Sequence, residues 1–217
     1  MNCCSSGSCD SSFDAPLAAR ELRRFLRKGP ARSTVQLIDA LAAESLGPDA
    51  TLLDVGGGIG AIHHLLLDRG VAGGVHLDGS VAYIDAARGE ANRRGHGDRM
   101  RFIHGRFPEA AATLGTFDIV TLDRVVCCDP DYEGVLGAAA AHALRIVAIC
   151  YPRPRWIVRL VIRGANWFRD VTGGTLRVFA HDPAAMAAVL TRSGLTRAWA
   201  GGTWVWAVEL FERRPAS

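Results

Sequence analysis

Nine residues near the start of the chain, LLDVGGGIG (52–60), constrain the fold more than any others. A short apolar run ends in four glycines, Gly56, Gly57, Gly58 and Gly60, and a helical pattern follows over 61–70. Glycines at such a turn let the backbone bend tightly and approach a ligand closely. The pattern therefore predicts a strand, a ligand-binding loop and a helix, with a nucleotide-like ligand at the strand's carboxyl end.

The rest of the chain continues this alternation of strands and helices. Four more apolar runs, at 74–78, 100–105, 117–123 and 144–152, are separated by helical segments. Such alternation predicts a parallel sheet with helices on both faces. Two further runs, 195–200 and 203–213, are separated by Gly201-Gly202, which predicts an antiparallel hairpin, and 176–181 is expected to be extended.

Two helices should precede the sheet. Asp14 and Pro16 predict the start of the first, which should end at Gly29, and the second should run from Ser33 or Thr34 to Gly47. We expect one domain of 217 residues in all. Its parts are a flexible Cys/Ser-rich tail (1–12), a helical cap (13–50) and a cofactor-binding core (51–212) that carries an insertion (153–181).

The insertion contains an amphipathic helix. Apolar residues alternate with Arg155, Arg159 and Arg163, which recur every four residues. Three interpretations are open: a packed insertion, a lid over a substrate pocket, or a helix at a membrane surface.

Composition excludes several partners and compartments. The formal net charge of +3 is too small to imply nucleic acid binding, and no run of 18 apolar residues predicts an integral membrane segment. The first twenty residues carry no apolar stretch typical of a signal peptide. The six cysteines form no C-x-x-C pair, so we expect a reduced cytoplasmic protein, and the sequence predicts no oligomeric state.

Two acids decide between two cofactor classes for the glycine loop. Gly56, Gly58 and Ala61 match the dinucleotide pattern, whereas Asp54, with the glycines at 56, 58 and 60, matches acid-x-G-x-G-x-G. A carboxylate at Asp54 would repel a pyrophosphate but suits a ligand that carries an ammonium and a sulfonium. Asp78, which ends the second strand, can accept hydrogen bonds from two ribose hydroxyls.

These segments resemble the class I S-adenosylmethionine-dependent methyltransferases. The matching pieces are LLDVGGGIG, VHLDGS, FIHGRF, FDIVTLDRVV and the terminal hairpin, which together span 51–212. The resemblance implies a Rossmann-like, seven-stranded sheet whose last strand is antiparallel. A closer likeness, through AARELRRFLRKGP and DRVVCCDPD, is to bacterial small-molecule methyltransferases with a cysteine-containing N-terminus.

The resemblance also implies a cofactor, S-adenosyl-L-methionine, and residues that hold it. Family members often have Gly-Asp after the third strand, with the acid on the adenine; here Gly105-Arg106 stands there, so a backbone group or Asp98 would replace it. The implied cofactor-binding residues are Asp54, Gly56, Gly57, Gly58, Gly60, Asp78, Gly79, Gly105, Arg106, Phe107, Leu122, Asp123 and Arg124.

Methyl transfer is an in-line displacement that requires an aligned O, N or S nucleophile. Asp123, at the end of a central strand, is the first candidate for a general base, and contact with the cofactor is an equal alternative. His63 or His64 can face the cofactor or lie on the surface; His63 is the second catalytic candidate. We predict no metal ligands. Trp156, Trp167 and Phe168 beside arginines suggest a small-molecule acceptor with an apolar body and an acidic group.

Two alternative functions stay open. Thiolates at Cys127 and Cys128, joined by Cys3, Cys4 or Cys9, would suit thiol- or metalloid-directed methylation or a metal-binding protein. Against this, buried cysteines usually act as small apolar side chains. The second alternative is an NAD-dependent oxidoreductase.

Overall fold

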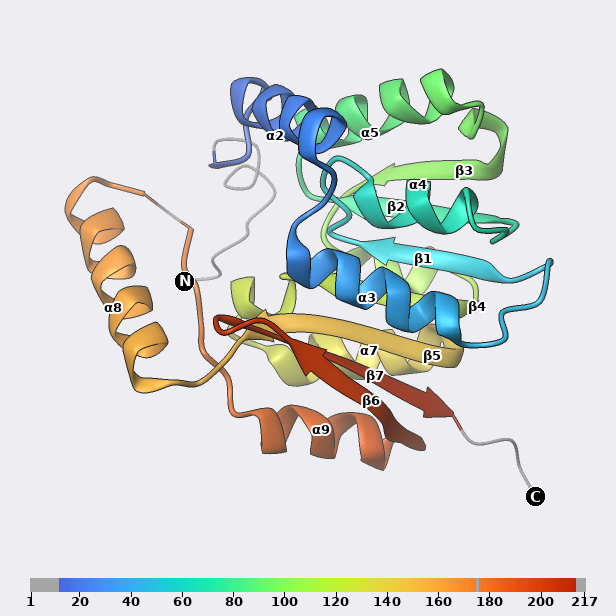
Figure 1. The fold of residues 1–217 in the computed structure, drawn as a ribbon. Coiled ribbons are helices and arrows are strands. Elements are labelled where there is room, and N and C mark those ends of the chain that lie inside the picture. Colours follow the sequence, from blue (N-terminus) through green and yellow to red (C-terminus); the bar gives the residue numbers. More distant parts are fainter. Residues whose placement is uncertain (1–11, 175, 214–217) are drawn as a thin grey trace.

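The computed structural model describes residues 12–174 and 176–213, and within them seven strands form one sheet (Figure 1). The strand order is β3-β2-β1-β4-β5-β7-β6. The strands are β1 (Thr51–Val55), β2 (Gly73–Asp78), β3 (Met100–His104), β4 (Phe117–Asp123), β5 (Ala143–Pro152), β6 (Leu195–Gly202) and β7 (Trp206–Arg213).

The pairing of the strands confirms the predicted sheet. β3, β2, β1, β4 and β5 pair in parallel, whereas β7 runs antiparallel to both β5 and β6. The chain order turns back between β1 and β4, and their carboxyl ends diverge there. This is the place where open α/β sheets bind ligands.

Helices cover both faces of the sheet (Figure 1). The predicted cap at Asp14 is present, since its carboxylate accepts from the backbone N–H of Leu17 at 3.0 Å, and the Ser80 hydroxyl likewise accepts from the backbone N–H of Tyr83 at 3.3 Å. The helices are α2 (Ala15–Lys28), α3 (Arg32–Ala43), α4 (Ala61–Leu67), α5 (Val81–Arg94), α6 (Phe107–Ala110), α7 (Tyr132–His142), α8 (Trp156–Val171) and α9 (Pro183–Arg192), with short 3₁₀ turns at Gly97–Arg99, Ala111–Thr113 and Val126–Cys128.

Alternate residues of each central strand supply two different cores. Leu53 and Val55 of β1 face α6, α7 and α9, whereas Leu52 faces α3 and α4. A third, smaller cluster joins α2 to α5 through Phe25 and Tyr83. The N-terminal helices are therefore packed against the helices that follow β1 and β2.

Two predicted details are wrong. Gly201-Gly202 is not the hairpin turn, because both glycines pair with β7 and the chain reverses at 203–205, where the N–H of Thr203 donates to the carbonyl of Trp206. α3 ends at Ala43 rather than at Gly47. Residues 176–181, which we expected to be extended, belong to no strand of the sheet, and the Phe179 N–H donates to the Cys127 carbonyl at 2.7 Å.

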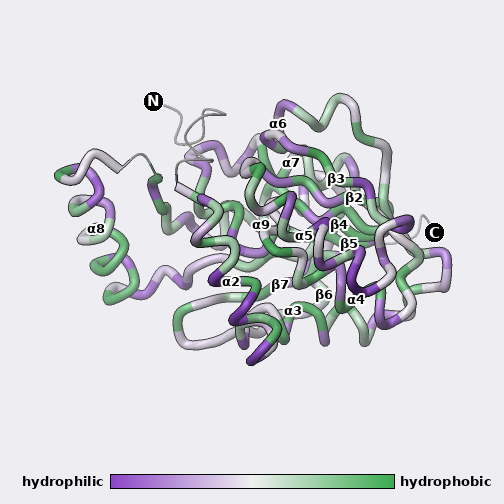
Figure 2. The backbone as a smooth tube through the Cα atoms, turned by 90° about the horizontal axis from the view of Figure 1, so that it is seen from above, coloured by the Kyte–Doolittle hydropathy of each residue, from purple (hydrophilic) through white to green (hydrophobic). Residues whose placement is uncertain are grey.

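Helix α8 extends away from the rest of the molecule (Figures 1 and 2). Val158 is its one buried residue, while Trp156, Leu160 and Trp167 are 73%, 62% and 67% exposed. The prediction of an amphipathic helix is confirmed. The interpretation as a packed insertion is wrong, because the apolar residues stay in solvent.

Within the described residues, no helix is long and apolar enough to cross a membrane. The proposed Cys/Ser tail, with Cys3, Cys4 and Cys9, lies outside the described residues except for Ser12.

Candidate functional site

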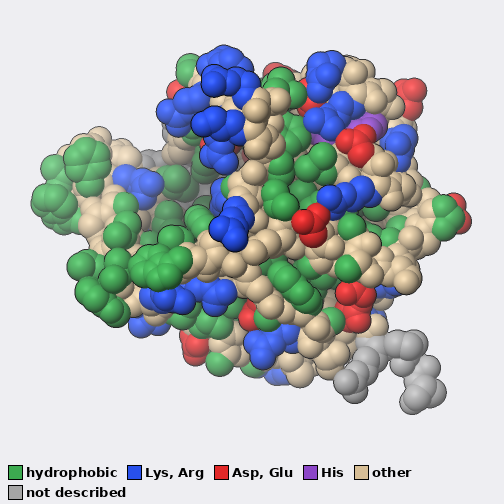
Figure 3. Space-filling view, in the orientation of Figure 1, with side chains coloured by type: hydrophobic (Ala, Val, Ile, Leu, Met, Phe, Trp, Pro, Cys, Tyr) green, Lys and Arg blue, Asp and Glu red, His purple; other side chains and the backbone are tan. Residues whose placement is uncertain are grey.

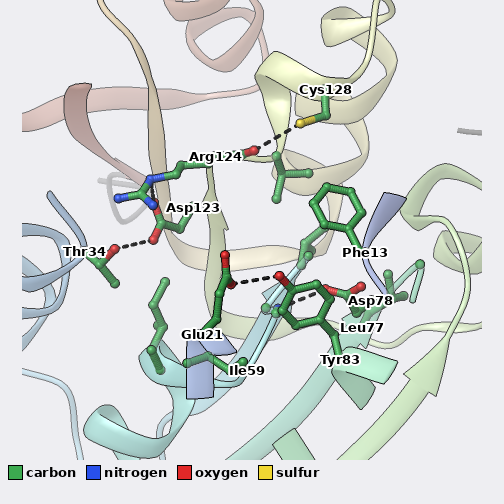
Figure 4. Close-up of a pocket in the computed structure, with 18 of the residues that line it drawn as sticks. Phe13, Glu21, Thr34, Ile59, Leu77, Asp78, Tyr83, Asp123, Arg124 and Cys128 are labelled. Carbon is green, nitrogen blue, oxygen red and sulfur yellow. Dashed lines mark hydrogen bonds and ion pairs between the residues drawn. The ribbon is translucent and has the colours of Figure 1, made fainter. Parts of the chain in front are cut away.

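A cavity of about 360 Å³ opens at the carboxyl ends of β1, β2 and β4 (Figure 4). That volume lies within the range of about 300–1,000 Å³ typical of small-molecule sites. Most of the predicted site residues lie on its wall: Gly56, Gly57, Gly58, Asp78, Gly79, Gly105, Arg106, Phe107, Asp123 and Arg124.

The glycine loop forms the floor of this cavity. Gly56 and Gly58 have φ angles of 58° and 55°, in the left-handed region that side chains disfavour. The Gly56 N–H donates to the carbonyl of Leu77 at 2.7 Å, which ties the loop to β2. The backbone conformation of the loop therefore requires glycine at positions 56 and 58.

Asp78 connects the glycine loop to the start of α5. One carboxylate oxygen accepts from the Gly58 N–H and the other from the Ser80 N–H, both at 2.9 Å. Burial raises the pKa of Asp78 to about 6, and the two backbone donors oppose that rise. The side chain is thus ionised at neutral pH and faces the cavity with capacity for further donors.

Asp123 ends β4 on the opposite side of the cavity (Figure 4). Its Oδ2 accepts a hydrogen bond of 2.6 Å from the Thr34 hydroxyl of α3. Its Oδ1 is buried and has no hydrogen-bond partner, and Arg124 Nε lies 3.7 Å away. A buried, unsatisfied carboxylate oxygen on a cavity wall is suited to receive a ligand's donor.

Arg124 has a strained backbone, with φ of 64° in a non-glycine residue. Its guanidinium donates to the Ser33 hydroxyl at 2.9 Å and lies 4.7 Å above the ring of Trp206. Strain of this kind costs about 1–3 kcal/mol and persists where surrounding contacts enforce it, commonly at functional sites.

Arg106 occupies the position where the family often has an acid. Its guanidinium binds Glu109 and Asp129, each at 3.1 Å, and both Arg106 and Asp129 lie on the cavity wall. The alternative residue Asp98 does not, since it is exposed on the turn before β3. Asp129 therefore brings a carboxylate to this end of the cavity.

Four of the predicted site residues are not on the cavity wall: Asp54, Gly60, Leu122 and His63. The Asp54 carboxylate is fully buried beneath the loop, where it accepts from the Thr121 hydroxyl at 2.8 Å and lies 3.2 Å from His63 Nδ1. Neither Asp54 nor His63 touches the cavity, so this geometry does not support direct contact with cofactor or acceptor. Both histidines after the loop are buried, so the alternative of a surface position is also wrong.

The buried histidines remain neutral. Burial, with positive charge from His96 and Arg94, lowers the pKa of His63 to about 3, and burial lowers that of His76 to about 3. Burial raises the pKa of Asp54. The side chains of Asp54, His63 and His76 lie close enough together to hold a metal ion. The sequence did not predict this group, because His76 follows the alternating pattern of an ordinary buried strand.

The N-terminal helices supply wall residues that no motif indicates. Thr34 is one, and Glu21 accepts a hydrogen bond of 2.8 Å from the Tyr83 hydroxyl at the cavity (Figure 4). Burial, together with Glu21, raises the pKa of Tyr83. Further wall residues from this part of the chain are Phe13, Arg24, Phe25, Gly29, Pro30 and Ala31. Tertiary packing brings these residues to the cavity, so their spacing in the sequence does not indicate that they line it.

Cys127 and Cys128 follow Asp123 along the chain, and Cys128 lies on the cavity wall. Contact with Cys128 and burial raise the pKa of Cys127 well above that of a free thiol. A protonated thiol is a poor metal ligand. Within the described chain, neither cysteine belongs to a group of three potential ligands.

Comparisons with known proteins find a domain match and a shared fold. Residues 53–143 match the model of a methyltransferase domain. Magnesium protoporphyrin IX methyltransferase from Synechocystis PCC 6803 with bound SAH superposes with a TM-score of 0.73 at 18% identity, over 95% of this chain and 98% of that one. An O-methyltransferase family protein from Burkholderia thailandensis gives 0.72 at 17% identity, over 98% and 66%.

A third structure, an O-methyltransferase family 2 protein from Planctomyces limnophilus in complex with apigenin, gives a TM-score of 0.68 at 15% identity, over 92% of this chain and 62% of that one. No curated protein sequence matches the chain. The domain match and the fold together make the chain similar to the class I S-adenosylmethionine-dependent methyltransferases, whose cofactor is S-adenosylmethionine.

Proposed function

We propose that this chain transfers a methyl group from S-adenosylmethionine to a small-molecule acceptor in the cavity at the ends of β1, β2 and β4. One observation carries the proposal: the glycine loop, Asp78 and Asp123 line the same cavity, with Asp78 and Asp123 on opposite sides of it (Figure 4). Bound there, the cofactor supplies a sulfonium-activated methyl group and a neutral leaving group.

The loop and Asp78 hold the cofactor's polar parts. Asp78 is ionised at neutral pH and accepts the ribose hydroxyls, while the backbone of Gly56 to Gly58 permits a close approach. Asp54 acts indirectly, because its carboxylate lies under the loop and supports it from below.

Asp129 replaces the missing acid at the adenine. Arg106 holds the Asp129 carboxylate at 3.1 Å, so the pair keeps an acceptor for the adenine amino group at the end of the cavity where Gly105 lies. Arg106 stands where family members often have an acid, and Asp129, 23 residues later in the chain, supplies the carboxylate instead.

Asp123 orients or deprotonates the acceptor's nucleophile. Thr34 fixes its Oδ2 at 2.6 Å, while Oδ1, which has no hydrogen bond and lies 3.7 Å from Arg124 Nε, accepts from the ligand's donor. Positioned acid–base groups of this kind contribute about 10²–10⁴-fold to rate.

The acceptor should have an apolar body and an anionic group. Phe13 and Phe25, with aromatic side chains, and Arg24 and Arg124, with basic ones, line the cavity together. Two of the similar structures, the magnesium protoporphyrin IX methyltransferase and the complex with apigenin, are named for molecules with flat ring systems, which supports this class of acceptor.

Calorimetry with S-adenosylhomocysteine tests the cofactor site. Because charge-assisted hydrogen bonds contribute about 1.5–3 kcal/mol each, Asp78→Ala should lower affinity at least tenfold. The exposed Asp98→Ala is the matched control and should bind like the wild type. No binding to wild-type protein, or equal binding by the Asp78 variant, would refute the proposal.

A second ligand tests Asp129 separately. S-inosylhomocysteine lacks the adenine amino group, so the wild type should prefer S-adenosylhomocysteine over it, and Asp129→Asn should lose most of that preference. Unchanged discrimination would remove Asp129 from the adenine site while leaving the rest of the proposal intact.

A labelled-methyl screen against a metabolite extract, with thiols and arsenite included, tests the acceptor class. Transfer to a thiol or metalloid would favour the alternative use of the cysteines, and fluorescence transfer from NADH would favour an oxidoreductase. Transfer to an oxygen or nitrogen of an apolar acid is the expected result.

A further inference from the structure

Beneath the glycine loop, outside the cavity, lies a compact group of three potential ligand atoms. Asp54 Oδ2 is 3.2 Å from His63 Nδ1, His63 Nδ1 is 3.2 Å from His76 Nδ1, and the third side of the triangle is 3.9 Å. All three residues are 0% exposed. They come from β1, α4 and β2, so the fold and not a local motif assembles them.

Hydrogen bonding alone does not satisfy this group. Each neutral imidazole carries one N–H. If both rings are protonated on Nδ1, two donors face each other at 3.2 Å; if either is protonated on Nε2, that N–H is buried without a partner. Every arrangement of protons on His63 and His76 therefore leaves a conflict or an unsatisfied buried donor, which costs free energy.

We propose that Asp54, His63 and His76 bind a divalent transition-metal ion of the zinc type. Ligands about 2.0–2.1 Å from tetrahedral Zn²⁺ lie about 3.3 Å apart, which is close to the observed separations. Two imidazoles and one carboxylate suit Zn²⁺, Co²⁺ or Ni²⁺, whereas Mg²⁺ and Ca²⁺ prefer oxygen alone. Thr121 donates to the other carboxylate oxygen at 2.8 Å and so orients this ligand.

The ion would support the loop from below. A Cβ at Gly57 would lie 2.5 Å from His76 Nδ1 and 2.6 Å from Asp54 Oδ2, so the loop backbone rests directly on the proposed ligands. Because none of the three lines the cavity, the ion takes no part in methyl transfer and fixes the shape of the loop.

Metal analysis of the full chain tests this site. The variant Cys3→Ser/Cys4→Ser/Cys9→Ser removes competing thiolates, and its metal content after dialysis against a chelator should be about one zinc per chain, the occupancy of a single site. Co²⁺ titration should give visible bands typical of nitrogen and oxygen ligands, without thiolate charge transfer.

Substitutions identify the ligands. Asp54→Asn keeps the shape of the side chain and removes its charge, and His76→Gln removes one imidazole ligand. Each of these single variants should weaken Zn²⁺ binding at least tenfold and lower the melting temperature of the zinc-loaded protein. His64→Gln is the matched control: it is equally buried but outside the triangle, so it should keep the metal. If the chain without Cys3, Cys4 and Cys9 binds neither Zn²⁺ nor Co²⁺, or if all variants bind them equally, the proposal is wrong.

A second, independent observation concerns α8. At 100° per residue, Trp156, Leu160 and Trp167 fall within a sector of about 40°. Asn166, whose side chain makes two hydrogen bonds to the backbone of Val178, and the buried Val158 lie on other sides of the helix. The apolar face thus points away from the molecule, and the space-filling view shows it in solvent (Figure 3).

We infer that α8 docks on an anionic lipid surface. The segment 153–171 contains five arginines and one aspartate, so a basic charge accompanies the apolar face. Amphipathic helices with tryptophan and arginine bind at the headgroup boundary of such membranes. A two-fold contact with a second copy would bring two such basic segments together, which like-charge repulsion disfavours.

Co-sedimentation with vesicles tests this inference. The chain should bind vesicles of phosphatidylcholine mixed with phosphatidylglycerol at least tenfold more strongly than vesicles of phosphatidylcholine alone. Leu160→Glu/Trp167→Glu should abolish binding, whereas Leu144→Glu, at another exposed leucine near the start of β5, should not. Equal binding by all variants, or a dimer in analytical ultracentrifugation that only the α8 variant disrupts, would overturn it.

Discussion

The glycine loop and α8 lie at the same end of the sheet but are built by opposite means (Figure 1). The loop residues line the cavity on one side and pack against the buried side chains of Asp54 and His76 on the other. Helix α8 has one buried residue and exposes its apolar face. The difference teaches that the cofactor side of the molecule is preorganised, whereas α8 depends on a surface outside the chain for its apolar contacts.

Asp123 gives the largest expected effect. If its Oδ1 serves as the base, Asp123→Asn should lower kcat by about 10²–10⁴-fold and leave S-adenosylhomocysteine affinity within a few-fold of wild type. Steady-state kinetics with the acceptor from the screen, together with calorimetry, measure the two quantities. The opposite pattern, lost affinity with retained kcat, would make Asp123 a cofactor contact instead.

Gly57 tests how tightly the loop is packed. A methyl group there would press on His76 and Asp54, and overpacking of this kind costs about 1–3 kcal/mol of unfolding free energy. Gly57→Ala should also weaken S-adenosylhomocysteine binding, since the loop must shift. Gly137→Ala, in α7 with open space around the new methyl, is the control and should be neutral or stabilising in chemical denaturation.

Asp78 predicts opposite pH dependences for binding and stability. Its pKa of about 6 means that affinity for S-adenosylhomocysteine should be constant above neutral pH and fall about tenfold per pH unit below 6. The folded pKa lies above the ordinary value of about 3.9, so ionisation penalises the folded state. Asp78's own contribution to unfolding free energy should therefore rise as pH falls from about 6 to 4.

Asp78→Asn provides the reference for both measurements. The difference between wild type and variant isolates the carboxylate from other titrating groups. An affinity that stays flat to pH 5 in the wild type would show that the ligand does not require the ionised carboxylate.

The sequence was most informative where local chemistry fixes the backbone. The bounds of β4 and the cap at Asp14 were predicted, because apolar runs and capping residues act locally, whereas the antiparallel last strand was implied by the resemblance to the methyltransferases. The hairpin turn was misplaced, since Gly201-Gly202 looks like a turn but is paired in the sheet.

The site residues show the same difference between features that local sequence determines and features that depend on tertiary packing. Asp78 and Asp123 were predicted because strand ends converge at one edge of a parallel sheet. Thr34 and Asp129 were not predicted as site residues, since only the packing of α3 and the Arg106 ion pair brings them to the cavity. His63 was predicted on the wrong side of the loop, because spacing places it on α4 but does not give the direction of its ring.

The smallest expected effect concerns α8 in solution. Leu160→Glu/Trp167→Glu should change the unfolding free energy by no more than about 0.5 kcal/mol, because exposed side chains without packing partners contribute little to stability. Urea denaturation measures this, and Leu37→Ala, in the fully buried core, should cost about 2–5 kcal/mol under the same conditions. A large loss in the α8 variant would mean that its apolar face packs against the chain in solution, and would favour a lid over a docking helix.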